Sequence, residues 1–161
     1  MVTARPPSRR AFTLVEALLV VIVLAIAVPA STMFLDQRAA QRADAATAAR
    51  ATVYAQAVME FVLADAASGH ALLGYAAFAD AGTYVDDPAT GMRARFANVS
   101  APYEALGYTF DVAVGPEVSA SGAATGDPSK DLFREVTVTV HAPGVGTDRL
   151  TIVLSSLVTD L

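Results

Sequence analysis

Hydrophobic and polar positions divide the chain into two parts that differ in their pattern. From Phe12 to Leu35 nearly every residue is apolar, and Glu16 is the only charged side chain in that run. The 19 residues of 17–35 carry no charge, and at about 1.5 Å per residue a helix of that length reaches roughly 28 Å, close to the hydrocarbon thickness of a bilayer. The pattern therefore predicts one membrane-spanning helix over residues 12–35.

Pro29 lies inside this predicted helix. Proline removes one helix hydrogen bond, and its ring clashes with the preceding turn. We therefore expect either a helix kink at Pro29 or a locally opened helix over residues 25–29.

The helix is predicted to continue beyond the apolar run. Residues 36–67 contain neither glycine nor proline and are rich in alanine, which favours helix. One face carries apolar residues at spacings of three and four, as expected for a helix that packs on a core: Ala51, Tyr54, Val58, Phe61 and Val62. Ser68-Gly69 is a stop signal. Residues 36–68 are therefore expected to form an amphipathic second half of the same helix.

Residues 69–161 show the alternation that is typical of strands. Apolar and polar positions alternate over residues 92–96, 108–114, 134–141 and 150–158, and turn or loop residues separate these stretches. Several antiparallel strands with one apolar face need a cover, which the amphipathic half-helix supplies. The predicted fold class is α+β, with a long N-terminal helix packed on a small antiparallel sheet.

Composition argues against several functions. With 11 basic and 16 acidic residues the formal charge is −5, which speaks against nucleic-acid binding. There are no cysteines and only two histidines, so no thiolate site exists and no metal or cofactor is expected. Asp86 and Asp87 stand in a DDPATG stretch, where turn chemistry is favoured over calcium binding. No catalytic motif is present, and we expect a protein that is not an enzyme.

The first eleven residues differ from the rest of the chain. They include Arg5, Arg9 and Arg10, two prolines and no acid, and they are expected to be a processed leader, 1–11. Three basic residues precede the apolar run, and two basic and two acidic residues follow it within residues 36–44. By the positive-inside rule this favours a cytoplasmic N-terminus and an exported C-terminal domain.

The junction Arg9-Arg10-Ala11-Phe12-Thr13-Leu14-Val15-Glu16 resembles the prepilin signature of type IV pilins and type II secretion pseudopilins. The resemblance covers residues 1–35. It implies that a prepilin peptidase cuts between Ala11 and Phe12, that Phe12 is then N-methylated, and that Glu16 is the carboxylate used in assembly. The family has glycine before the cut, whereas this chain has Ala11.

This resemblance implies a structural subunit, either a minor pilin or a pseudopilin, of a type IV pilus-like filament or a type II secretion pseudopilus. Its expected partners are other pilin or pseudopilin subunits, the prepilin peptidase, an inner-membrane assembly platform and membrane lipid. The expected location is the bacterial inner membrane, with a single pass and a periplasmic C-terminal domain, and then the assembled filament. The absence of cysteine departs from the disulfide-closed loop of many major pilins.

Two other interpretations of the N-terminus stay open. Ser8-Arg9-Arg10 is also typical of a twin-arginine export signal, and Val28-Pro29-Ala30 before Ser31 is an acceptable cleavage site. The product would then be a soluble periplasmic binding domain. The second alternative is a single-pass membrane protein that does not polymerise, which leaves Glu16 without a partner in the membrane.

Overall fold

The computed structural model describes residues 13–70, 72–144 and 150–160. The chain divides into two compact units, Met1–Asp44 and Ala45–Leu161. The predicted leader and the two residues at the predicted cut, Ala11 and Phe12, lie outside the described residues.

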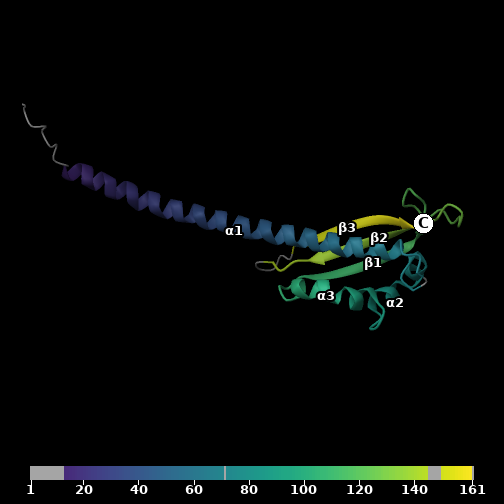
Figure 1. The fold of residues 1–161 in the computed structure, drawn as a ribbon. Coiled ribbons are helices and arrows are strands. Elements are labelled where there is room, and N and C mark those ends of the chain that lie inside the picture. Colours follow the sequence, from purple (N-terminus) through teal and green to yellow (C-terminus); the bar gives the residue numbers. More distant parts are fainter. Residues whose placement is uncertain (1–12, 71, 145–149, 161) are drawn as a thin grey trace, which may run out of the picture. The chain divides into compact units, whose positions relative to one another are not determined.

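Helix α1 spans Leu14–Ala66 and contributes to both units (Figure 1), which confirms the predicted long helix. It ends where the sequence predicts. The backbone N–H of Ser68 donates to the carbonyl of Asp65 at 2.9 Å, and Gly69 has a φ of 61°. Only glycine adopts that left-handed conformation without steric cost, so Gly69 closes the helix.

Three antiparallel strands follow in the spatial order β1-β2-β3. They are β1 (Thr109–Val118), β2 (Phe133–His141) and β3 (Thr151–Thr159). All three were predicted, and together with α1 they confirm the α+β class. The strand predicted over residues 108–114 was expected to end at Gly115-Pro116, whereas β1 continues to Val118. A register shift between Val114 and Glu117 accommodates the proline.

The strand predicted over residues 92–96 is wrong. These residues begin helix α3, which spans Met92–Glu104. Met92, Phe96 and Ser100 are the buried positions of α3, and they recur every four residues. Over only five residues, the alternation of a strand cannot be distinguished from the i, i+4 spacing of a helix. Two short elements precede α3, the 3₁₀ helix η1 (Tyr75–Asp80) and helix α2 (Ala81–Asp86), and neither was predicted.

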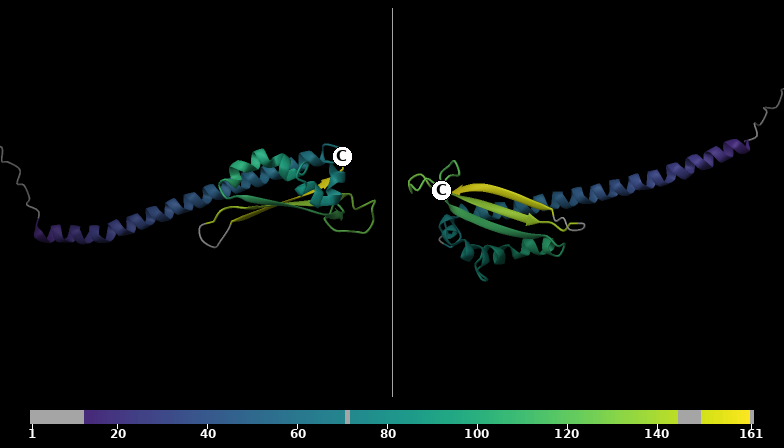
Figure 2. Two further views of the ribbon diagram at one scale, coloured as in Figure 1. Left: turned by 90° about the horizontal axis from the view of Figure 1, so that it is seen from below. Right: turned by 180° about the vertical axis from the view of Figure 1, so that it is seen from behind.

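The core of the second unit lies between the sheet and the helices. The second half of α1 and helix α3 cover the same face of the sheet (Figure 2). The predicted stripe on α1 faces this core, where Ala51, Tyr54, Val58 and Val62 have no exposed surface. β2 contributes its inward-facing row of fully buried valines, Val136, Val138 and Val140.

Aromatic rings join α1 to α3 and β1. The ring of Tyr54 stacks on Tyr103 with centroids 4.1 Å apart, and it meets the edge of Phe110 at 5.7 Å. Phe61 meets Phe96 at 5.1 Å. Such pairs add specific geometry to the area that they bury, so this part of α1 is fixed to its own globular domain.

Candidate membrane and assembly segment

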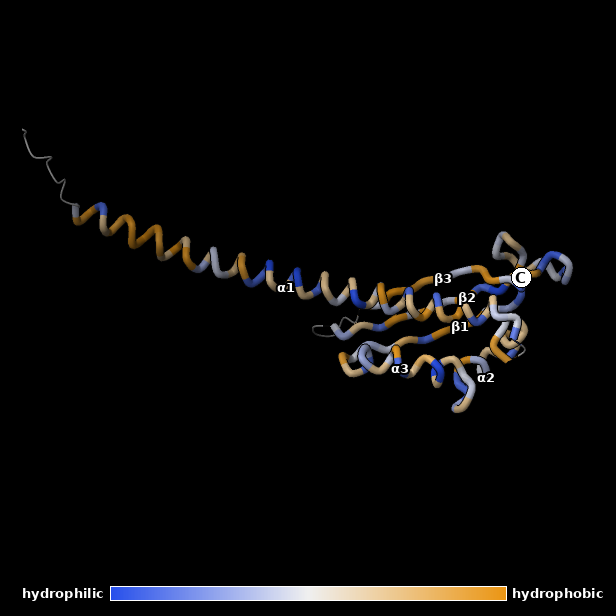
Figure 3. Tube along the Cα trace, in the orientation of Figure 1, coloured by the Kyte–Doolittle hydropathy of each residue, from blue (hydrophilic) through white to orange (hydrophobic). Residues whose placement is uncertain are grey.

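The first part of α1 is apolar on all sides, and its side chains are exposed. Among the large hydrophobic residues from Leu14 to Leu35, exposure runs from 43% at Val20 to 83% at Leu14. Figure 3 shows the same stretch as an almost continuous hydrophobic run. An apolar surface of this extent needs lipid or other protein to cover it. By length and composition, α1 is able to cross a membrane.

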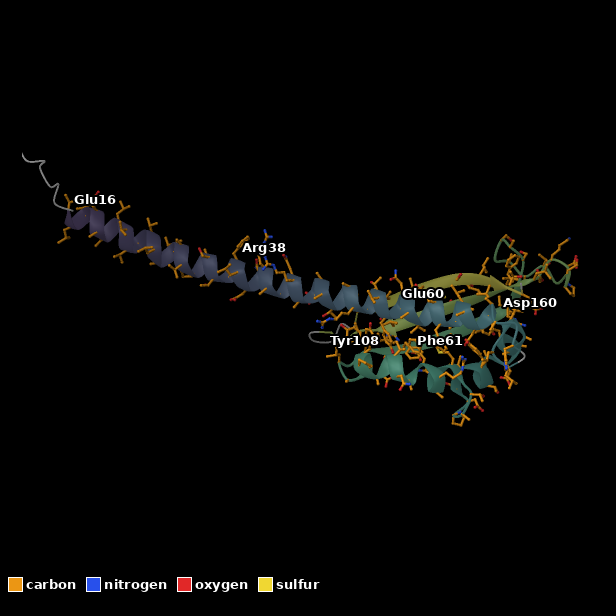
Figure 4. All side chains as sticks on the ribbon, in the orientation of Figure 1. Glu16, Arg38, Glu60, Phe61, Tyr108 and Asp160 are labelled. Carbon is orange, nitrogen blue, oxygen red and sulfur yellow. The ribbon has the colours of Figure 1, made fainter. Side chains whose placement is uncertain are left out.

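Glu16 lies in the first turn of α1 (Figure 4). Its backbone N–H donates to the carbonyl oxygen of Thr13 at 3.0 Å and to the Thr13 hydroxyl oxygen at 3.3 Å. Thr-x-x-Glu is the spacing of a capping box, in which the hydroxyl serves the third residue of the helix. A carboxylate in the first turn also interacts favourably with the positive end of the helix dipole. Glu16 is therefore placed where its carboxylate supports the start of the helix.

Among residues 13–70, 72–144 and 150–160, no basic side chain forms an ion pair with Glu16. The amine that cleavage before Phe12 would create, four residues before Glu16 in the sequence, lies outside the described residues. A carboxylate surrounded by apolar side chains needs a counter-charge from somewhere when the segment is in lipid or in a packed bundle. The apolar segment therefore carries one charged side chain, Glu16, which needs a counter-charge in either environment.

α1 stays helical through Pro29, so no turn is opened over residues 25–29. The expected kink remains a prediction about bending. Two hydroxyls near the proline bond within the helix: the Ser31 hydroxyl donates to the Ala27 carbonyl at 2.7 Å, and the Thr32 hydroxyl donates to the Pro29 carbonyl at 2.9 Å. Side chains that satisfy themselves in this way fit a helix in an apolar environment.

At its other end, α1 carries a buried carboxylate that the sequence analysis did not identify. Asp65 is 7% exposed. The two guanidinium nitrogens of Arg95 donate to its two oxygens at 2.8 and 2.6 Å, and the Tyr84 hydroxyl donates to it at 2.8 Å. The guanidinium also lies over the ring of Phe61, 5.1 Å from its centroid. This network ties α1 to both α2 and α3.

The network also changes how its members ionise. Burial, helped by the hydrogen bond to Asp65, raises the pKa of Tyr84. The hydrogen bonds to Asp65 raise the pKa of Arg95. One feature of the sequence could have identified this site. Asp65 falls on the same helical face as the apolar stripe, three residues after Val62, and an acid buried on such a face needs a partner.

Arg93 and Arg95 are the polar positions of the strand predicted over residues 92–96, and both belong to α3 instead. Arg93 pairs with Asp86 at 2.9 Å and with Asp111 at 3.0 Å, and it donates to the carbonyl of Phe110 at 3.0 Å. Both carboxylates are about two-thirds exposed. Arg93 therefore joins α2, α3 and the edge of β1 through solvent-screened contacts.

The Asp86-Asp87 turn is built by ordinary side-chain capping. The carboxylate of Asp87 accepts hydrogen bonds from the backbone N–H groups of Ala89 and Thr90 and from the Thr90 hydroxyl. These bonds, from Thr90 first, lower the pKa of Asp87. Within residues 13–70, 72–144 and 150–160, no three histidine or acidic side chains gather in a way that could hold a metal ion.

Comparison of the chain with family models, with curated proteins and with solved structures found no match.

Proposed function

We propose that the protein is a structural subunit, a minor pilin or pseudopilin, of a type IV pilus-like filament or a type II secretion pseudopilus. One observation carries the proposal: a single carboxylate, Glu16, stands in the first turn of α1, in the exposed apolar part of that helix and five residues into the run that begins at Phe12. The resemblance of residues 9–16 to the prepilin signature supports it.

The mechanism follows from charge matching. After cleavage between Ala11 and Phe12, the new amine carries a positive charge close to Glu16. Two opposite charges can neutralise each other in a low-dielectric environment, whereas a single charge left there is strongly unfavourable. A subunit that enters a bundle of apolar helices is then held in the register that brings an amine and a carboxylate together, either within one subunit or between neighbours.

The two parts of the chain have separate tasks in this proposal. The apolar part of α1 holds the subunit in the inner membrane and later in the filament core, where alanine-rich helix surfaces pack closely. The domain built from Ala45 onward is the exported part. Its own core holds the second half of α1, so the domain keeps its fold while the subunit moves from membrane to filament.

The N-terminus of the mature protein tests this function against both alternatives. Intact mass and N-terminal sequencing of protein from cells that have a prepilin peptidase should give methylated Phe12. A chain that begins at Ser31 would indicate twin-arginine export and a soluble product. An uncut chain that begins at Met1 would indicate a membrane protein that does not polymerise.

A further inference from the structure

The two edges of the sheet differ in how they are guarded against another strand. β1 carries Asp111 and Glu117, a proline at Pro116 and a register shift. Charges, prolines and bulges are the usual means of blocking edge-to-edge pairing. β3, at the other edge, has the sequence TIVLSSLVT, nine residues with no charge and no proline. Figure 1 shows no further strand beside it.

The hydrogen-bonding groups of β3 that face this open edge can be identified. The N–H of Ala142 donates to the carbonyl of Leu150 at 2.8 Å. Hydrogen-bonded pairs alternate along an antiparallel ladder, so the even-numbered residues of β3 bond to β2. The odd-numbered residues therefore direct their N–H and C=O groups outward: Thr151, Val153, Ser155, Leu157 and Thr159. Val153 and Leu157 are also 56% and 40% exposed.

At its odd-numbered positions, β3 keeps the same order of polar and apolar residues when it is read backwards about Ser155. Antiparallel pairing of two copies around this residue sets Thr151 opposite Thr159, Val153 opposite Leu157, and Ser155 opposite its own counterpart. Each of these pairs joins residues whose backbone groups point outward, and each matches polar with polar or apolar with apolar. No like charges meet. A second copy therefore satisfies the outward backbone groups of the edge and matches the side chains at these odd-numbered positions.

We propose that β3 is a self-association surface, at which two copies of this chain pair antiparallel about Ser155 and join their sheets into one. The twofold axis is perpendicular to the sheet, because directly opposed residues of an antiparallel pair lie on the same face. Both copies then keep their helices on the same side of the joined sheet. The residues of α1 from Ala45 to Ala66 run in opposite directions in the two copies.

This contact is separate from the proposed filament contacts. Subunits of one filament share one direction, whereas β3 pairing joins copies of opposite direction. The surface also lies wholly within the second unit, on a strand remote in sequence from Glu16. The inference therefore does not rest on the proposed function, and either one can fail without the other.

The natural absence of cysteine makes a crosslinking test clean. In a directly opposed, hydrogen-bonded pair the Cα atoms are about 5.5 Å apart, within the range that a disulfide spans. Full-length Ser155→Cys, in detergent with micelles in excess over protein, should form a disulfide-linked dimer when mildly oxidised. Ser156→Cys is the matched control, because the next residue along the strand points to the core face and should give little dimer.

A mixed experiment tests the register. Val153→Cys and Leu157→Cys should each form no disulfide-linked dimer when oxidised alone. In the paired copies, identical positions are about four residues, or roughly 14 Å, apart along the strands. Mixed together, they should form a disulfide between the two variants. Adding Val153→Lys to Ser155→Cys should abolish the dimer while the circular dichroism spectrum stays unchanged.

Equal yields of disulfide-linked dimer from Ser155→Cys and Ser156→Cys would overturn the proposal. A disulfide-linked dimer from Val153→Cys alone would also overturn it. A wild-type chain that sediments as one copy per micelle at every concentration would also overturn it, and would leave the edge to a strand of a different protein.

Discussion

Arg95 holds Asp65 by two parallel hydrogen bonds of 2.8 and 2.6 Å, which join helix α3 to a residue 30 positions earlier on α1. Both groups are largely buried, with side chains 23% and 10% exposed. This pair, with the hydroxyl of Tyr84, joins α1 to α2 and α3 by polar contacts.

Removing one partner of this pair should destabilise the domain strongly. Asp65→Ala leaves the guanidinium of Arg95 without its counter-charge, and breaking a buried pair typically costs about 3 to 5 kcal/mol. Replacing both partners, as in Asp65→Leu with Arg95→Met, should recover much of that loss because no unpaired charge remains. Urea unfolding followed by circular dichroism gives both values. Equal losses for the single and double variants would contradict the pairing.

Two buried tyrosines should make the domain sensitive to alkali. Burial first, and the charge of Glu104 next, raise the pKa of Tyr54 to about 12, and burial raises the pKa of Tyr84. A raised pKa means that the folded state keeps the proton more tightly than the unfolded chain. This stability is complete below the ordinary tyrosine pKa of about 10 and is lost as the pH rises through the folded value.

The matched variants Tyr54→Phe and Tyr84→Phe separate the two tyrosines. Among the described residues the buried hydroxyl of Tyr54 has no hydrogen-bond partner, so Tyr54→Phe should leave stability at pH 7 almost unchanged. Tyr84→Phe loses a hydrogen bond to a carboxylate and should cost about 1.5 to 3 kcal/mol. The unfolding free energy of the wild type should decline between pH 9 and pH 12. Each variant should show a smaller decline over the same range. An unchanged decline in both would refute the assignment.

Deleting residues 1–44 should leave a folded, water-soluble domain. Among the residues that the structure describes, every buried hydrophobic one lies from Ala51 onward, so the deletion removes exposed apolar surface and no described core residue. Circular dichroism and a cooperative thermal transition would show the fold, and deletion of residues 1–66 is the control that removes all core residues contributed by α1. An unfolded product from the shorter deletion would mean that the exposed half of α1 is needed for folding.

Much of this fold could be predicted because its signals are local. The stripe from Ala51 to Val62 repeats at the helical period over three turns, and β2 alternates over its whole length. The five residues from Met92 to Phe96 misled because alternation and a helical i, i+4 pair look alike in so short a window. Residues 75–86 form two short helices, neither of which is long enough to show a helical period in the sequence.

The candidate site was predictable in part for a different reason. Glu16 stands out because the residues around it are apolar, so its chemical environment is visible in the sequence itself. The Asp65–Arg95 pair depends on a contact across 30 residues that only the folded chain defines. The Thr13 hydroxyl accepts a hydrogen bond from the backbone N–H of Glu16, and the apolar pattern alone does not suggest this contact at the helix start.

Processing depends on the size of the residue before the cut. Ala11→Leu should block cleavage while membrane insertion is kept, because the peptidase must accept the side chain beside the scissile bond and the bilayer need not. Ala11→Gly, which restores the residue usual in the family, should be cut at least as fast as wild type. A blot of precursor and mature chain in the membrane fraction measures this. Normal cleavage of Ala11→Leu would place the cut elsewhere.

The role of Glu16 is tested by a series of substitutions that separates charge from helix capping. Glu16→Gln keeps the ability of the side chain to bond at the helix start but loses the charge. Glu16→Leu loses both and removes a charge that is costly in lipid, so its membrane insertion should be normal or better.

Incorporation into filaments, divided by the amount of the same variant in the membrane, is the most direct measurement of the central claim. It can be made on sheared filaments or crosslinked pseudopilus complexes. The charge-matching mechanism predicts strong loss for Glu16→Leu, because the amine of Phe12 is then buried without its counter-charge, and an intermediate value for Glu16→Gln. Incorporation of Glu16→Leu at the wild-type level would contradict that mechanism and leave Glu16 with its capping role alone.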